Sequence, residues 1–140
     1  VFHTCALLAD QTVSCWGANT YGQIGDGTTT DRLGPVGVTG PEVTSLSAGA
    51  YHSCSSYSNG VVRCWGRNSG GRLGDGTTTD RLHPTRVSSL SGAASVTSGG
   101  YRSCALTTTT AWCWGANGSG QLGNATRTTS PKPVMVSGLS

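Results

Sequence analysis

One five-residue pattern, Cys-Trp-Gly-x-Asn, occurs three times in the 140 residues of the chain. Its copies begin at Cys15, Cys64 and Cys113, so consecutive copies are 49 residues apart. A fixed period of this size is typical of repeat proteins, in which each repeat is one supersecondary unit that buries its apolar face only against its neighbours. We therefore interpret residues 1–140 as a single repeat array, with repeats at approximately 1–42, 43–92 and 93–140.

Each repeat contains four short segments with the pattern of β-strands. In the first repeat, strands separated by a tight turn are expected at Phe2–Leu8 and Thr12–Gly17, and a glycine-containing loop, Ala18–Arg32, follows them. A further strand begins at Pro35, and Val43–Gly49 alternates apolar and small residues as an inner strand does. Four-stranded sheets at this spacing are the blades of a β-propeller. The predicted fold is therefore all-β, with about three four-stranded antiparallel blades in a propeller that is partial or completed by oligomerisation, and with each repeated tryptophan packed between neighbouring sheets.

Composition supports a turn-rich β protein and argues against nucleic acid as a partner. The chain has 22 glycines and only 11% charged residues, far from a helix-rich mixture. Its net charge of +3 comes from scattered side chains, without the basic stripe that neutralises phosphates. No apolar run approaches the length of a membrane span. We expect neither nucleic-acid binding nor membrane insertion.

Six cysteines form three pairs at equivalent positions of the repeats, namely Cys5 and Cys15, Cys54 and Cys64, and Cys104 and Cys113. Opposite residues of an antiparallel hairpin are close enough for a disulfide, so one bridge per repeat is the favoured interpretation, and buried free thiols are the alternative. Three bridges would indicate an oxidising, extracellular or cell-surface location. A metal site is not expected, because Arg102 replaces the histidine that precedes the first cysteine in the other repeats and no C-x-x-C spacing occurs.

The combined motifs resemble a known family. They are His-Ser/Thr-Cys-Ala-Leu, Val-x-Cys-Trp-Gly-x-Asn, Gly-Gln-Leu-Gly-Asp-Gly-Thr, Pro-x-x-Val and Leu-Ser-Ala-Gly, and together they resemble the regulator of chromosome condensation repeat, with the cysteines similar to those of bacterial secreted members. The resemblance covers essentially the whole chain and implies a propeller, usually seven-bladed in that family. About three blades would then be a fragment of a longer propeller or a unit that assembles with other copies. Family members include a GTPase exchange factor, enzyme inhibitors and surface proteins, so the resemblance alone does not select a function.

Neither catalysis nor a cofactor is indicated. His3 and His52 take equivalent positions, as structural residues do, and no nucleophile and base stand outside the repeat pattern. The aspartates of the Gly-Asp-Gly-Thr segments are interpreted as acceptors of backbone hydrogen bonds in tight turns, and the Asp-Arg pairs that follow as local ion pairs. We therefore expect a non-enzymatic protein without cofactor or metal. Two glycosylation sequons begin at Asn117 and Asn124.

Positions that differ between the repeats lie mainly in the predicted loops and are free to serve a partner. Tyrosine and arginine are favoured contact residues, and the candidates for a partner-binding surface are Tyr21, Arg67, Arg72 and Arg86. The leading hypothesis is a secreted or surface-exposed module that binds a protein or glycan through its loops. The alternative is a structural building block whose open ends associate into rings or filaments, that is, a homo-oligomer. A GTPase exchange role, implied by the resemblance alone, is third.

Overall fold

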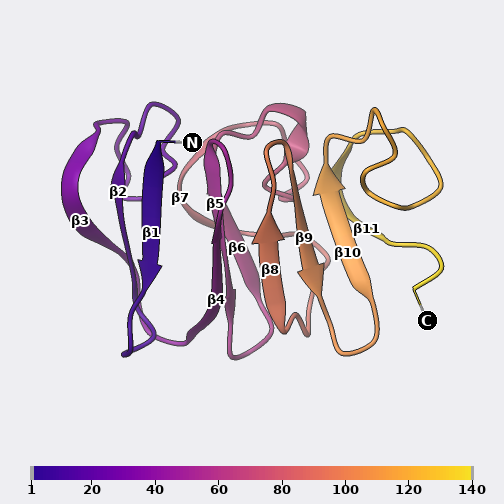
Figure 1. Ribbon diagram of the computed structural model, residues 1–140, viewed down its shortest axis with the longest axis horizontal. Helices are drawn as coiled ribbons and strands as arrows, with labels where there is room; N and C mark the ends of the chain where they lie inside the picture. The colour runs from indigo at the N-terminus through magenta and orange to yellow at the C-terminus, as the bar shows by residue number, and fades with distance from the viewer. Residues whose placement is uncertain (1, 140) are drawn as a thin grey trace.

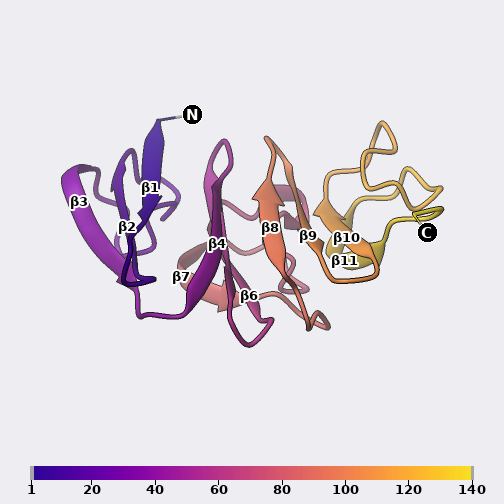
Figure 2. The same ribbon diagram turned by 60° about the horizontal axis from the view of Figure 1, so that its bottom comes forward.

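The computed structural model describes residues 2–139, which form three antiparallel sheets side by side along the chain (Figure 1, Figure 2). We call the sheets blades 1, 2 and 3. Blade 1 consists of β1 (His3–Leu7), β2 (Val13–Gly17) and β3 (Arg32–Thr39). Blade 2 consists of β4 (Val43–Ala48), β5 (His52–Tyr57), β6 (Val62–Gly66) and β7 (Arg81–Arg86). Blade 3 consists of β8 (Ser95–Ser98), β9 (Arg102–Leu106), β10 (Ala111–Gly115) and β11 (Ser130–Met135).

The all-β prediction is confirmed, and the blades follow the predicted strand pattern. In blades 2 and 3 the spatial order of the strands is their order in the chain, and the strands of blade 1 are equivalent to β5, β6 and β7. One short 3-10 helix, η1 (Ser69–Gly71), lies in the loop between β6 and β7. No helix in the part of the chain that the structure describes is long and apolar enough to cross a membrane.

The glycine of each Cys-Trp-Gly copy is required by a bend at the end of a strand. Gly66 has a φ of +105°, and a Cβ there would lie 2.6 Å from the carbonyl oxygen of Tyr51, the residue before the neighbouring strand β5. The pairing of β6 with β7 changes register between Cys64 and Gly66. Only glycine combines a positive φ with so close an approach of two backbones. The bend directs the chain into the loop that follows β6.

The three predicted cysteine pairs are disulfides. Each joins residues that lie directly opposite in a hairpin, and the Cα–Cα distances are 4.1, 4.1 and 4.0 Å for Cys5–Cys15, Cys54–Cys64 and Cys104–Cys113. No free cysteine occurs in residues 2–139. Each bridge therefore fastens the two middle strands of one repeat to each other.

Replacing both Cys54 and Cys64 with alanine is expected to lower the free energy of unfolding by about 3 kcal/mol, because the bridge restricts a loop of roughly ten residues in the unfolded chain. Both sulfur atoms are also buried, so their removal leaves a cavity. Urea unfolding without reductant measures the loss. The Cys5→Ala/Cys15→Ala variant is the matched control, because it opens a loop of the same length but its Cys5 is only half-buried, so its loss should be smaller. An unchanged midpoint in the Cys54/Cys64 variant would contradict the expectation.

The core lies between the blades. Trp65 and Trp114 are completely buried, and each packs against a glycine of the preceding blade, Gly25 or Gly74. A Cβ at either glycine would lie 2.6 Å from the indole Nε1. Each buried indole removes a large apolar surface from water, so the tryptophan contacts stabilise the stacking of blades. The interpretation of these two tryptophans as core residues is thus confirmed, whereas Trp16 of blade 1 is only partly buried.

Candidate functional site

The loop between β6 and β7 is held in one conformation by Asn68, which is fully buried. Its Nδ2 donates to the carbonyl oxygens of Thr77 (3.1 Å) and Thr79 (2.9 Å), and its Oδ1 accepts the Leu73 N–H at 2.9 Å. One side chain therefore satisfies backbone groups on both limbs of the loop. The equivalent hydrogen bonds in the other two blades are made by Asn19 and Asn117.

The aspartate of the Gly-Asp-Gly-Thr segment completes the loop. Asp75 Oδ1 accepts the Thr77 N–H (2.9 Å) and hydroxyl (2.7 Å), as expected for a turn aspartate, and its Oδ2 pairs with Arg81 Nε at 2.7 Å. Burial alone would raise the pKa of the Asp75 carboxyl, but hydrogen bonds from Thr77 and Arg81 outweigh it and hold this pKa below its ordinary value. The predicted pair of adjacent residues Asp80 and Arg81 is wrong, because Asp80 instead accepts the Asn68 N–H (2.7 Å). In blade 1 the same correction applies, with Arg32 paired to Asp26 and Asp31 bonded to Asn19.

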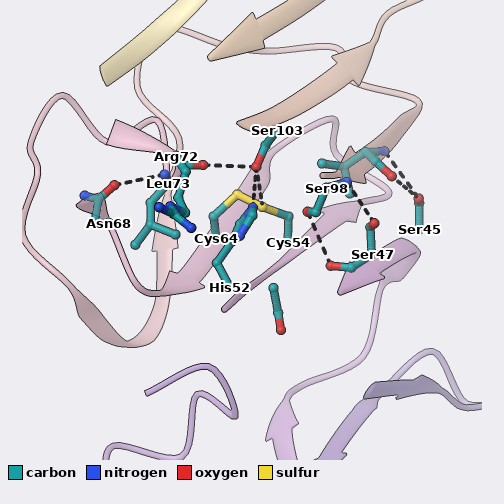
Figure 3. Close-up of a disulfide and its surroundings, with 12 residues drawn as sticks. Ser45, Ser47, His52, Cys54, Cys64, Asn68, Arg72, Leu73, Ser98 and Ser103 are labelled. Atoms are coloured by element: carbon teal, nitrogen blue, oxygen red, sulfur yellow. Dashed lines mark hydrogen bonds between the residues drawn. A yellow bond between two sulfur atoms is a disulfide. The ribbon is translucent and has the colours of Figure 1, made fainter. Parts of the chain in front are cut away.

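A histidine and a serine join each of blades 1 and 2 to the next blade, and Figure 3 shows the pair between blades 2 and 3. His52 Nε2 of blade 2 lies 2.8 Å from Ser103 Oγ of blade 3, and the Ser103 hydroxyl donates to the Arg72 carbonyl at 3.0 Å. Since that hydroxyl has a single proton, the imidazole must donate through Nε2–H, which leaves Nδ1 unprotonated in the neutral ring. Between blades 1 and 2 the same bonds are made by His3, Ser53 and the Gln23 carbonyl.

Both of these histidines are held neutral. Burial, with a smaller effect of the Arg72 charge, lowers the pKa of His52 to about 3, and burial lowers the pKa of His3 to about 4. The Nδ1 atoms of both rings are buried without a hydrogen-bond partner among residues 2–139, so a second proton there would be unsatisfied. These two histidines therefore serve as hydrogen-bond donors between blades.

An arginine and two tyrosines from separate segments meet where blade 1 adjoins blade 2. The Arg67 guanidinium lies over the ring of Tyr21, 4.6 Å from its centroid, and 5.7 Å from the centroid of Tyr51. The two rings are 5.6 Å apart and meet edge-on at 79°. We call Tyr21, Tyr51 and Arg67 the arginine–tyrosine cluster. All three are half-buried, so the cluster presents aromatic surface and a cation to solvent.

The charge of this cluster is not neutralised by a carboxylate. The ion pairs found in residues 2–139 are Arg32 with Asp26 and Arg81 with Asp75, and Arg67 belongs to neither. Its guanidinium N–H groups therefore remain available to an acceptor from outside the chain.

Arg72 is not part of an exposed surface, which corrects its prediction as a contact residue. Its exposed fraction is 2%, and its guanidinium donates to the carbonyl oxygens of Ser69 (3.1 Å) and Gly100 (3.0 Å). The guanidinium carbon lies 4.9 Å from the centroid of the Tyr101 ring. Burial, reinforced by the nearby Arg67 charge, lowers the pKa of Arg72. Arg72 thus fastens the loop of blade 2 to the turn before β9 of blade 3.

The other three predicted contact residues do not form one surface. Tyr21 and Arg67 lie together in the cluster, whereas Arg86 is exposed at the end of β7, outside the cluster. Sequence reasoning missed Tyr51 and Tyr101, because it searched positions that differ between repeats. The available signal was the aromatic residue directly before β5 and β9, at the position that Phe2 occupies before β1.

The two sequons differ in accessibility. Asn117 is completely buried, and its Nδ2 donates to the carbonyl oxygens of Thr126 and Thr128 at 3.1 Å each. A glycan would replace one of the two hydrogens on that nitrogen, so at least one of these bonds would be lost, and a completely buried side chain leaves no room for a sugar; the folded chain therefore excludes glycosylation at Asn117. Asn124 is only half-buried and uses Oδ1 for its hydrogen bonds to Asn117 and Thr126, and it stays a candidate.

A comparison with protein-family models matches the chain over most of its length. The regulator of chromosome condensation (RCC1) repeat matches residues 11–55, 59–106 and 110–140, and a second model of that repeat matches 43–72. The chain belongs to the RCC1 repeat family. A sequence comparison with curated proteins found no significant match to this RCC1-repeat chain.

Solved structures share the RCC1-repeat fold of the chain. Yeast RCC1 (Prp20) bound to Kap60 is 22% identical with a TM-score of 0.85, and 96% of this chain covers 35% of that one. Prp20p from Saccharomyces cerevisiae is 22% identical with a TM-score of 0.81, and 96% of this chain covers 36% of it. Human WBSCR16 is 20% identical with a TM-score of 0.85, and 96% of this chain covers 35% of it. The chain thus spans about a third of the length of these proteins. At such identities the likeness shows the fold, a β-propeller, and not the activity.

Proposed function

We propose that this RCC1-repeat chain is a non-enzymatic, extracellular module that binds a partner protein through the arginine–tyrosine cluster. The observation that carries the proposal is the position of Arg67 over two tyrosine rings, 4.6 and 5.7 Å from their centroids, with its charge unpaired in residues 2–139. Arginine and tyrosine are enriched among the residues that dominate binding energy. The Asn19 and Asn68 networks hold the loops that carry Tyr21 and Arg67, so little conformational entropy is lost on binding.

Three features support the remaining parts of this proposal. The three disulfides favour an oxidising compartment and disfavour a role as a GTPase exchange factor in a reducing nucleus or cytosol. His3 and His52 are buried donors between blades, which supports a structural and not a catalytic role for them. Among the structural relatives, yeast RCC1 (Prp20) was solved with Kap60, and Prp20p is described with binding to Gsp1p and histones, so protein binding is a use of this fold.

The Tyr21→Ala/Arg67→Ala variant is expected to retain a secreted partner at least about tenfold less well than the parent chain, because loss of a central arginine and tyrosine typically costs more than 1.4 kcal/mol of binding free energy. The measurement is a quantitative pull-down from the secreted proteins of the source cells, with mass spectrometry of what is retained. Arg86→Ala is the matched control, since Arg86 is an exposed arginine outside the cluster.

Arg86→Ala should unfold at the midpoint of the parent chain, because Arg86 is exposed. Tyr21→Ala/Arg67→Ala removes half-buried side chains between blades 1 and 2 and should lower the midpoint, so retention is compared at a temperature where both variants are fully folded. Equal retention of the same partners by the parent and by the Tyr21/Arg67 variant would contradict the proposal. A loss that the Arg86 variant shares equally would also contradict it, because the binding surface would then lie elsewhere.

A further inference from the structure

A groove of about 420 Å³ lies between blades 1 and 2, at the opposite end of β5 and β6 from the arginine–tyrosine cluster. Tyr57, the last residue of β5, and Arg63, near the start of β6, line it, whereas Tyr51 and Arg67 of the cluster lie at the other ends of these strands. Its sides are the connection from β3 to β4 and the turn between β5 and β6, both at the lower edge of Figure 1. Such a volume is typical of sites for small ligands. We call it the blade 1–2 groove.

The groove is open because an arginine stands where the next blade has a tryptophan. Arg63 and Trp112 are equivalent, since each directly precedes the second cysteine of its hairpin. Trp112 packs against the core between blades 2 and 3, together with the buried Leu90 from the connection after β7. At the blade 1–2 groove, the connection after β3 has the exposed residues Gly40 and Pro41 instead, and Arg63 is exposed. A charged side chain and a small connection thus replace two apolar side chains.

The remaining lining is largely apolar. Val38 and Tyr57 line the groove and also pack against the core between blades 1 and 2. Pro41 and Pro84 add apolar surface that loses no side-chain entropy on binding. The Arg63 guanidinium carbon lies 5.7 Å from the centroid of the Tyr57 ring, which holds the cation beside this apolar wall.

Glu42 brings a carboxylate to the groove from an unfavourable backbone conformation. Glu42 has a φ of +81°, and the equivalent residue between blades 2 and 3 is Gly92, with a φ of +69°. The two are equivalent because they directly precede Val43 and Ala93, whose N–H groups make matching hydrogen bonds to the hairpin turns. Glycine adopts a positive φ readily, whereas glutamate is strained there. The Ser58 N–H donates to the Glu42 carbonyl at 2.9 Å and holds this backbone in place.

The two charges of the groove do not neutralise each other. Arg63 and Glu42 are its charged lining residues, both are exposed, and neither belongs to an ion pair within residues 2–139. Arg86 lies opposite Arg63 on β7 but does not line the groove. The groove therefore presents one cation and one anion to solvent beside an apolar surface. A ligand that satisfies both must itself carry an anion and a cation.

We propose that the blade 1–2 groove binds a short zwitterionic peptide of about two residues. Its carboxylate accepts hydrogen bonds from the Arg63 guanidinium, its ammonium group donates to the Glu42 carboxylate, and its apolar side chains pack against Tyr57 and Val38. An extended dipeptide separates its charged ends by up to about 7 Å, so one ligand reaches two side chains that do not contact each other. A free amino acid, by contrast, carries both charges on one carbon.

The site is tested by titrating the isotope-labelled chain with the dipeptide leucyl-leucine at neutral pH and following the backbone amide shifts by NMR. We expect saturable shifts at Glu42, Tyr57 and Arg63, with a dissociation constant of about 1 mM or lower for a ligand of this size. The amides of Tyr21 and Arg67 should not shift, so the outcome is independent of the function proposed for the arginine–tyrosine cluster. No saturable shift in the groove up to ~20 mM peptide would overturn the proposal.

Arg63→Gln and Glu42→Gln should each raise the dissociation constant about fivefold, the upper range for a partly exposed ion pair. Both side chains are exposed, so both variants should fold as the parent chain does. Arg127→Gln is the matched control, because Arg127 is an exposed arginine of blade 3 that does not line the groove. Glu42→Gly should bind as weakly as Glu42→Gln but unfold no earlier than the parent chain, because glycine suits the φ of +81°. Binding that neither groove substitution weakens, or that Arg127→Gln weakens equally, would contradict the proposal.

Blocked peptides show which end of the ligand each side chain binds. Acetylation of the amino end removes the ammonium charge, so it should weaken binding to the parent chain about fivefold and binding to Glu42→Gln hardly at all. Amidation of the carboxyl end should have the same relation to Arg63→Gln. If acetylation weakened binding to the parent chain and to Glu42→Gln by the same factor, Glu42 would not bind the ammonium group and the proposal would be wrong.

Discussion

Acidification from about pH 7 to about pH 4.5 is expected to remove about 5 kcal/mol of stability through His3 and His52 alone. Burial holds the pKa of His52 at about 3 and that of His3 at about 4, against 6.5 for an unburied imidazole. Below pH 6.5 the unfolded chain therefore binds a proton at each ring and the folded chain does not. The free energy of unfolding falls by about 1.4 kcal/mol per pH unit for each histidine. This stabilisation is fully present above the unfolded pKa and is lost as the pH falls.

Urea unfolding at a series of pH values measures this slope. His52→Gln removes one titrating ring but keeps a side-chain N–H donor toward Ser103, so the slope between about pH 6 and pH 4.5 should fall by about half. The turn carboxylates do not act in this window, because the pKa values of Asp26 and Asp75 are lowered from 3.8 and their contribution is lost only below that pH. If the free energy of unfolding changed with pH equally in the parent chain and in His52→Gln, the His52 ring would not be buried in its neutral form.

Asn68→Ala is expected to lower the free energy of unfolding by about 4 kcal/mol, because each buried polar group left without a partner costs about 1 to 3 kcal/mol. The substitution removes the donor to the carbonyl oxygens of Thr77 and Thr79 and the acceptor of the Leu73 N–H. Leu73 is completely buried in the core between blades 2 and 3, so the loop cannot open without exposing it. Asn68→Ala should therefore also weaken the packing between blades 2 and 3.

Asn59→Ala is the matched control, since Asn59 bonds the Val61 N–H at 3.1 Å in an exposed turn where water can replace it. Its cost should be about 1 kcal/mol or less. Thermal or urea unfolding of both variants, with the disulfides intact, gives the comparison. If Asn68→Ala lost no more stability than Asn59→Ala, the Asn68 network would not hold the loop.

The architecture was predictable from residues because its signals are local and repeated. Cys54 and Cys64 are equidistant from the turn between them, so a hairpin in simple register places them opposite each other, as the structure shows. Gly66 ends the strand because its φ is positive, and its equivalents recur at the same period. In a propeller every repeat folds into the same blade, so three copies of the pattern in one sequence give three independent indications of that blade structure.

The surface was less predictable because it depends on contacts between successive blades. Arg67 and Arg72 are five residues apart in one loop, and no pattern in the sequence distinguishes the half-buried one from the one that is 2% exposed. The difference arises because Arg72 reaches the Gly100 carbonyl before β9, whereas Arg67 lies over Tyr21 of the preceding blade. The same reasoning explains why Arg81 pairs with Asp75 instead of its neighbour Asp80, because the loop folds back on itself.

The residues alone thus specify the β-strands, the cross-strand cysteine pairs and the family, since each of these follows from short-range spacing. Only the tertiary structure decides which arginine is buried and which tyrosines join the cluster. The physical reason is that these features depend on how one blade is placed against the next, where Trp65 and Trp114 set the packing. Contacts of that kind join residues about fifty positions apart, such as His52 and Ser103, and although both residues recur with the repeat, neither segment shows by itself which residue of the next blade it will contact.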